Sequence, residues 1–93
     1  MNDMRRAVIT VLGYDQKGII AKVSDVLLRN DANILDISQT ILSGLFNMVL
    51  IADISAEDCD FTAISDELMA YGKENNLQIR VQRSEIFEAM HQI

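Results

Sequence analysis

A chain of 93 residues that is 49% apolar is long enough for one compact core and too short for two domains, since chains of about this size bury only ~60–65% of their unfolded surface. The net charge of −6, with no block of basic residues, opposes a phosphate backbone and argues against a nucleic-acid partner. The sequence contains neither a long apolar run nor a basic-then-apolar leader, so we expect a cytoplasmic protein without a membrane partner.

The first third of the chain predicts a strand, a loop and a helix. Residues Arg6 to Leu12 are β-branched and apolar and stop at Gly13, which is typical of a buried strand. From Ile19 onward, apolar residues recur at helical spacing until Asn30 closes the segment. The polar loop between strand and helix therefore lies at the helix N-terminus.

The middle third predicts a β-hairpin. Residues 33 to 42 alternate between apolar and polar side chains, as a strand with two different faces does. Ser43 and Gly44 then permit a reversal into a second strand from Phe46 to Ile54. Two adjacent antiparallel strands are expected here.

A second helix and a fourth strand complete the pattern. Asp60 is a suitable N-cap for the helix, and Asn75 and Asn76 offer a left-handed stop. A strand with one polar face follows from Leu77 to Val81. The order βαββαβ predicts an α+β fold of the ferredoxin-like type, with a four-stranded antiparallel sheet and two helices on one face.

The first and third predicted strands are apolar on both faces near their centres, so they should lie in the middle of the sheet. Two helices cover only one of those faces. The candidates for covering the other are the C-terminal segment SEIFEAMHQI, as a short helical tail, and a second copy of the protein. We expect a homodimer in which the tail helps to shield the open face.

The loop before the first helix has two interpretations. Asp15 can cap the helix, and Gly13 and Gly18 can supply backbone angles that other residues resist, so no ligand is required. Alternatively, the free amides at the helix N-terminus suit a carboxylate, while Asp15 or Gln16 receives an ammonium group. A free amino acid carries both groups.

The same residues resemble a known family. The run GYDQKGIIAKVSDVL from Gly13 to Leu27, followed by NILDISQ from Asn33 to Gln39, is similar to the signature of the ACT domain, a regulatory module of amino-acid metabolic enzymes. Small single-domain bacterial members related to the glycine-cleavage regulator are the best match. The resemblance implies a single ACT-like domain over residues 1–93, with a core at about 5–83 and a tail at 84–93.

The resemblance also implies a function. Domains of this family associate side by side through sheet edges, and hold an amino-acid-sized ligand between subunits. It therefore implies a non-enzymatic sensor without a cofactor, a homodimer or higher homo-oligomer that signals to a protein partner in trans. Many members have a proline before the loop glycine, where this chain has Lys17. Carried over by position, the ligand-binding residues are Asp15, Gln16, Lys17, Gly18, Ile19, Asn33, Ile34 and Asp36.

Enzymatic and metal-binding alternatives find less support. The one histidine, His91, lies close to the end of the sequence, and Cys59 has no companions at metal-ligand spacing. The acidic cluster from Glu57 to Asp60 lacks the spacing and turn glycine of a calcium loop. Acylphosphatases share the predicted topology but need an arginine in the first loop, where Lys17 is the only cation. Neither a catalytic nor a metal site is expected.

Two binding alternatives remain. An RNA-recognition module needs aromatic residues on the central strands, and the third strand offers only Phe46. A ligand-free interaction or dimerisation module stays open, with Met48, Phe87 and Met90 as its adhesive surface. A sensor must gain stability from a specific small molecule, whereas an interaction module need not.

Overall fold

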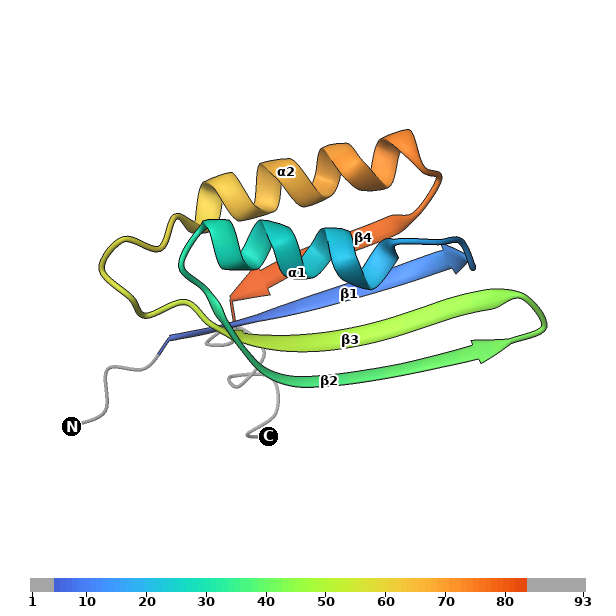
Figure 1. The fold of residues 1–93 in the computed structure, drawn as a ribbon, viewed down its shortest axis with the longest axis horizontal. Coiled ribbons are helices and arrows are strands. Elements are labelled where there is room, and N and C mark those ends of the chain that lie inside the picture. The colour runs from blue at the N-terminus through green and yellow to red at the C-terminus, as the bar shows by residue number, and fades with distance from the viewer. Residues whose placement is uncertain (1–4, 84–93) are drawn as a thin grey trace.

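The computed structural model describes residues 5–83, and the predicted helical tail and His91 lie outside that range. Six elements follow one another in the predicted βαββαβ order (Figure 1). Their bounds are β1 Arg6–Tyr14, α1 Ile19–Arg29, β2 Asn33–Leu42, β3 Leu45–Asp53, α2 Phe61–Glu74 and β4 Gln78–Arg83.

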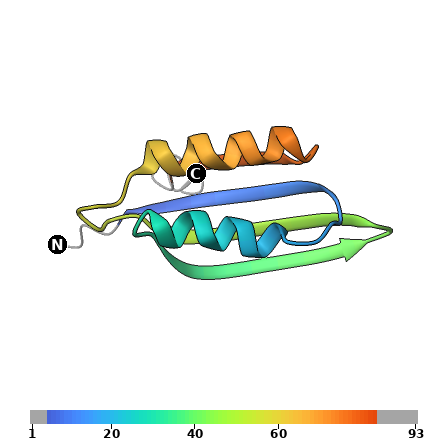
Figure 2. The same cartoon turned by 45° about the horizontal axis from the view of Figure 1, so that its top comes forward.

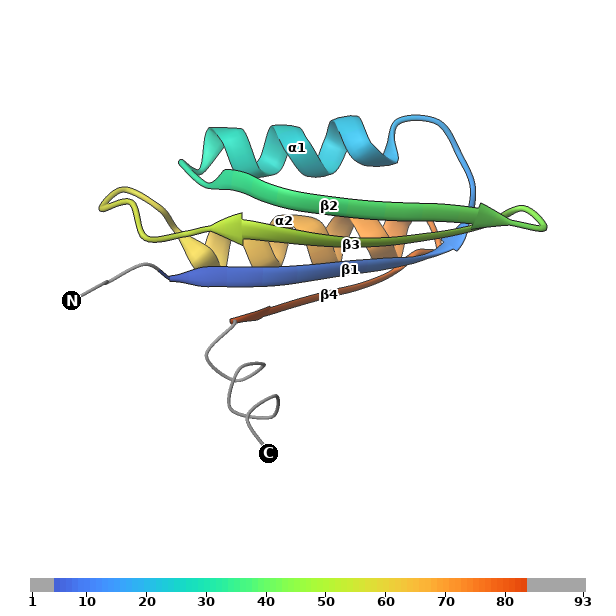
Figure 3. The same ribbon diagram turned by 90° about the horizontal axis from the view of Figure 1, so that it is seen from below.

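The four strands form one antiparallel sheet in the order β2-β3-β1-β4. Both helices lie on the same face of this sheet, and the opposite face carries no helix among the described residues (Figures 1 and 3). The ferredoxin-like fold is therefore confirmed, with the two strands predicted to be central, β1 and β3, in the middle. β1 continues past Gly13 to Tyr14 because its last residues pair with the start of β3 at Phe46 and Leu45.

The core fills the layer between sheet and helices. Ile9 and Val11 of β1 and Leu50 of β3 are fully buried, and Val23 of α1 and Leu68 of α2 cover them from above. Alternation along the strands sends these side chains to one face. Met48 is also fully buried, so its predicted place on an adhesive surface is wrong: it lies on the helix side of β3.

The two helices begin differently. The Asp60 carboxylate accepts a hydrogen bond from the Ala63 amide at 3.0 Å, so the predicted cap of α2 is confirmed. Asn75 caps the other end of α2, and Asn76 is left-handed with φ of 57°. The expected Asp15 cap of α1 is wrong, because the N-cap residue is Gly18 and no side chain caps the helix.

Position 13 requires glycine because neighbouring atoms leave no room for a Cβ, and not because of its backbone angle. The glycines with positive φ among the described residues are Gly18 and Gly44, which corrects the expected role of Gly13. A Cβ at Gly13 would lie 2.5 Å from Leu77 Cδ2 and 3.2 Å from the Asn76 carbonyl oxygen. β1 therefore runs directly under the turn between α2 and β4.

The sheet face without helices exposes part of the central strands. Leu12 of β1 is 39% exposed and Val49 of β3 is 41% exposed, whereas Val8 is buried. The expectation that this face needs a cover therefore concerns mainly the Leu12 end. No helix within residues 5–83 is long and apolar enough to cross a membrane.

Candidate functional site

The loop that joins β1 to α1 is held in place by its own backbone. The Asp15 amide donates to the Gly44 carbonyl at 2.9 Å, which fastens the loop to the β2–β3 hairpin. The Gln16 side-chain amide donates to the carbonyls of Tyr14 at 3.1 Å and Asn75 at 3.3 Å. Gln16 thus joins the loop to the end of α2, and its carbonyl oxygen is the side-chain atom left for a ligand.

The first turn of α1 presents free amides. Gly18 has φ of +87°, in the left-handed region that glycine favours, and the turn holds neither a side-chain cap nor an acidic residue. Free amides and the positive end of the helix dipole favour an anion there. The Asp15 carboxylate is exposed and makes no hydrogen bond or ion pair with another described residue. The loop thus offers one group for each end of a zwitterion.

The other two predicted loop residues contribute differently. The Ile19 side chain is 2% exposed and belongs to the core, so only its backbone amide faces the loop. Lys17 is exposed and lies beside Gly18, where a Cβ would meet nothing within 4 Å. The space above Gly18 is therefore open, which leaves room for a small ligand in a single chain.

The three predicted residues of β2 do not share one face. Asn33 and Ile34 line a groove of about 230 Å³ between α1 and β2, together with Leu28. A β-bulge follows Ile34, after which Asp36 pairs with Ile51 on the sheet face opposite the helices. There the Asp36 carboxylate accepts a hydrogen bond from the Ile37 amide at 2.9 Å.

Within one chain the two halves of the predicted site lie far apart. The Asp15–Gly18 loop precedes α1, and Asn33 follows it (Figures 1 and 2). α1 has 11 residues, and at 1.5 Å per residue it spans about 16 Å. An amino acid is too small to bridge that distance. A single copy therefore supplies either half of the site but not both together.

β2 is an edge strand with an apolar border. Ile20 and Leu28 of α1, eight positions apart on one helical stripe, are 37% and 76% exposed. Beside them lie Ile34, Ile37 and Ile41 of β2, all at least 36% exposed. We call these five residues the edge surface. Sequence reasoning missed it, although the spacing of Ile20 and Leu28 was the available signal.

The acidic cluster before α2 lines a polar hollow of about 650 Å³, together with Arg5 and Arg83. No three His, Cys, Asp or Glu side chains between residues 5 and 83 gather closely enough to hold a metal ion. Cys59 is half-buried, and burial raises the pKa of its thiol, which keeps it in the less nucleophilic protonated form.

Comparisons with known proteins agree with the fold. The ACT domain family model matches residues 5–82. A UPF0237 protein of Methanocaldococcus jannaschii is 48% identical over 90 residues, which cover 97% of this chain and all of the relative. The solved structure of an ACT domain protein from Streptococcus pneumoniae superposes with a TM-score of 0.75 and 40% identity, covering 94% of this chain and 97% of that one.

A more distant structure shares the fold alone. A protein assigned as a glycine cleavage system transcriptional repressor superposes with a TM-score of 0.75 at 22% identity. The match covers 88% of this chain and 47% of that protein. The same fold therefore occurs as one part of a larger chain.

Proposed function

The chain belongs to the ACT domain family, a regulatory fold, and on that premise we propose that it is a non-enzymatic, cytoplasmic sensor of a small zwitterion, most simply an amino acid. The observation that carries this proposal is the uncapped first turn of α1 together with the preceding Asp15 carboxylate, which has no hydrogen-bond or ion-pair partner among residues 5–83. The ligand carboxylate binds the amides that follow Gly18, and its ammonium group binds Asp15.

A second copy completes the site. If two β2 edges pair antiparallel about an axis near Ile37 and Ser38, the centre of the strand, Asn33 of one copy lies beside Leu42 of the other. The hairpin that follows Leu42 carries Gly44, to which the Asp15 amide is bound. This pairing brings the loop of one copy next to the start of β2 in the other, so that Asn33 and Ile34 close the site.

The edge surface supports this assembly. Its five apolar side chains lose water when α1 and β2 of one copy meet those of the other, and burial of apolar area stabilises association by about 25 cal/mol per Å². The free backbone groups of the β2 edge gain partners in the same step. Because the ligand contacts both copies, ligand binding and dimerisation strengthen each other. A protein partner that binds only the dimer would then respond to the ligand.

A thermal-shift screen against the twenty amino acids, at several protein concentrations, tests the proposal. A specific ligand at one hundred times its dissociation constant should stabilise the protein by about 2.7 kcal/mol. The dimerisation constant should tighten with the same ligand, as measured by sedimentation. A dimer that no small molecule stabilises would instead identify a ligand-free interaction module.

A further inference from the structure

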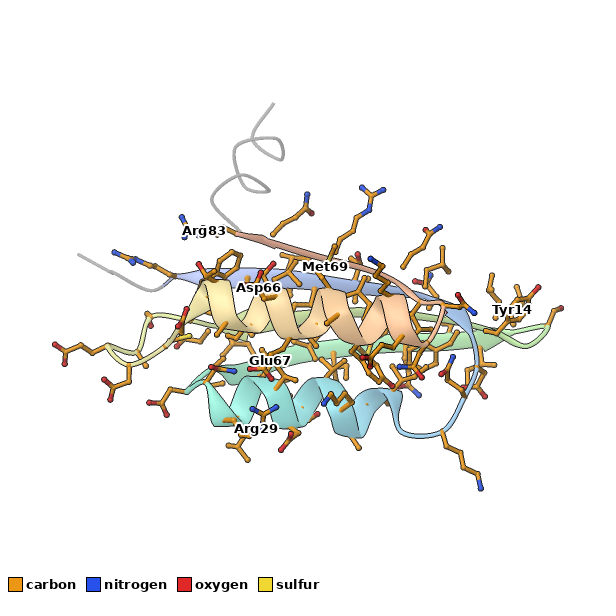
Figure 4. The ribbon with its side chains drawn as sticks, turned by 90° about the horizontal axis from the view of Figure 1, so that it is seen from above. Tyr14, Arg29, Asp66, Glu67, Met69 and Arg83 are labelled. Carbon is orange, nitrogen blue, oxygen red and sulfur yellow. The ribbon has the colours of Figure 1, made fainter. Side chains whose placement is uncertain are left out.

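A groove of about 570 Å³ runs between α2 and β4. Met69, Ala70 and Lys73 form its α2 wall, and Leu77 and Ile79 lie on the β4 side. Met69 points to the β4 side of α2, away from α1 (Figure 4), and is 51% exposed, whereas Leu77 and Ile79 are buried. The groove therefore has a buried apolar floor and an exposed wall that includes a flexible methionine, a residue that adapts to different apolar partners.

The floor of the groove is held by a close approach of α2 to β4. A Cβ at Gly72 would lie 2.8 Å from the Leu77 carbonyl oxygen and 3.1 Å from Ile79 Cγ1. The Leu77 amide also donates to the Gly72 carbonyl at 2.8 Å, which fixes the turn between the two elements. A partner would therefore meet a surface that is already formed, which lowers the entropic cost of binding.

The groove is basic in a chain that is acidic overall. Lys73 and Arg80 border it, and none of the described residues that line it is acidic, although the net charge of the chain is −6. Neither cation has a hydrogen-bond or ion-pair partner within residues 5–83. Asp66 lies on the same side of α2 as Met69 (Figure 4) but does not line the groove. Carboxylates of a partner would thus find two available cations.

β4 is an edge strand of the sheet, so one row of its backbone N–H and C=O groups has no strand partner among residues 5–83. An extended peptide can add to such an edge, where main-chain hydrogen bonds give affinity and alternate side chains give specificity. Ile79 pairs with Val11 and faces the helices, so the neighbouring Arg80 is directed to the other face. An added strand would therefore present one set of side chains to the groove and the other set to Arg80.

We propose that the α2–β4 groove docks an extended acidic segment of another protein, which adds to the β4 edge as a fifth strand. Apolar residues at every second position of the segment lie in the groove beside Met69. The acidic residues between them face Arg80 on the other side of the sheet, and Lys73 attracts the segment from the helix side. β4 has six residues, and six residues of strand span about 20 Å, so a segment of that length is sufficient.

A second copy of the chain fits this edge less well. β4 contains two arginines and no carboxylate. Two-fold pairing of β4 with β4 about Arg80 or Val81, the middle of the strand, makes the two Arg80 side chains direct or diagonal neighbours, and like charges so placed repel. The side-by-side dimer proposed above uses β2 and leaves β4 at both ends of the joined sheet. The groove is therefore independent of the proposed function and stays accessible in that dimer.

Fluorescence anisotropy of a labelled hexapeptide that alternates glutamate and valine tests the proposal, with the full chain and no added amino acid. The peptide should bind, and Lys73→Glu and Arg80→Glu should each weaken binding about threefold or more, and both together about tenfold or more, because attraction becomes repulsion. Lys22→Glu, on α1, changes the net charge equally and should leave binding unchanged. A lysine–valine peptide should bind the double variant better than wild type. Circular dichroism checks that each variant is folded.

Hydrogen exchange measured by NMR locates the contact. Addition of the glutamate–valine peptide should slow exchange of β4 amides and leave the amides of β2, the other edge strand, unchanged. A peptide of three glutamates followed by three valines should bind more weakly, because it cannot place carboxylates on one face and apolar groups on the other.

Four outcomes would overturn the proposal. Absence of peptide binding would mean that the β4 charges serve only to keep the edge unpaired. An equal loss of binding in Lys22→Glu and Arg80→Glu would indicate an effect of net charge alone. Slower exchange in β2 instead of β4 would place the contact on the other edge. If β4 amides are already protected in the free chain, with NMR cross-peaks to residues 84–93, the chain's own C-terminal segment is the occupant.

Discussion

The main-chain amide of Asp15 donates to the carbonyl of Gly44 at 2.9 Å. This bond fastens the β1–α1 loop to the β2–β3 hairpin without using the Asp15 side chain, whose carboxylate is exposed. The main-chain amide of Asp15 therefore fixes the position of the loop, while its side-chain carboxylate is available for a ligand. Substitution of the side chain tests ligand binding while the anchoring bond stays in place.

Asp15→Asn should change binding and not stability. Removal of a charge-assisted hydrogen bond, worth about 1.5–3 kcal/mol, should weaken the stabilising amino acid by about tenfold or more in calorimetric titration. Urea unfolding should stay within about 0.5 kcal/mol of wild type, because no helix cap is lost. Asp58→Asn, at another exposed carboxylate, is the matched control and should change neither value. A stability loss of about 1 kcal/mol would instead indicate a cap.

Gly18 should be constrained by conformation and by the ligand, not by packing within the chain. With φ of +87° and nothing within 4 Å of a Cβ, Gly18→Leu should cost about 1–2 kcal/mol, the usual penalty for a left-handed residue. Its bulk should also abolish ligand binding. Gly18→Asn should cost less stability, since asparagine tolerates this region, but should still weaken binding. Full binding by the leucine variant would place the site elsewhere.

The overall fold could be predicted because local signals agreed with one another. Asp60 as a cap, Asn76 as a left-handed stop and the Ser43–Gly44 reversal each follow from short-range chemistry, and the structure shows all three. Apolar residues on both faces of β1 and β3 likewise predicted which strands are central, because only central strands need both. Each of these features depends on neighbours in sequence.

The candidate site was less predictable because its constraints come from distant residues. Gly13 is fixed by Leu77, more than sixty positions away, and Gln16 is held by the Asn75 carbonyl. The β-bulge after Ile34 turns Asp36 to the sheet face opposite the helices. Regular strand alternation would place Ile34 and Asp36 on the same face, and the sequence carries no signal of the bulge. Asp15 is likewise held by a distant residue, because its amide donates to the Gly44 carbonyl of the hairpin.

Gly13→Ala should destabilise the protein by overpacking. The new methyl group would meet Leu77 Cδ2 at 2.5 Å and the Asn76 carbonyl oxygen at 3.2 Å, and such overpacking typically costs about 1–3 kcal/mol. Leu77→Val removes the Cδ2 atom that the new methyl group would meet. In a double-mutant cycle measured by urea unfolding, the cost of Gly13→Ala should be smaller in the Leu77→Val background. Equal costs in both backgrounds would show that the Leu77 side chain is not what excludes a Cβ.

The ion pair between the helices should make stability depend on acid. Arg29 and Glu67 lie side by side on the facing sides of α1 and α2 (Figure 4), and Arg29 Nη2 donates to Glu67 Oε1 at 2.8 Å. Arg29 Nε donates to Asp25 Oδ2 at 2.9 Å. The hydrogen bond from Arg29 lowers the pKa of Glu67 from its ordinary value. The Arg29–Glu67 pair therefore contributes fully to stability above the pKa of Glu67 in the unfolded chain, near 4.3. That contribution is lost as the pH falls through the lower pKa of Glu67 in the folded protein.

The free energy of unfolding, measured in urea between pH 7 and 3, should accordingly fall less in Glu67→Gln than in wild type. Asp53 has its pKa lowered by hydrogen bonds from the Ser55 side chain and amide, but it contributes equally to both proteins and cancels in the difference. Asp66, the neighbouring carboxylate on α2, makes no hydrogen bond or ion pair with another described residue. Asp66→Asn should therefore keep the wild-type pH dependence. If Glu67→Gln retains it too, the Arg29–Glu67 pair does not persist in solution, and the acid sensitivity belongs to other carboxylates.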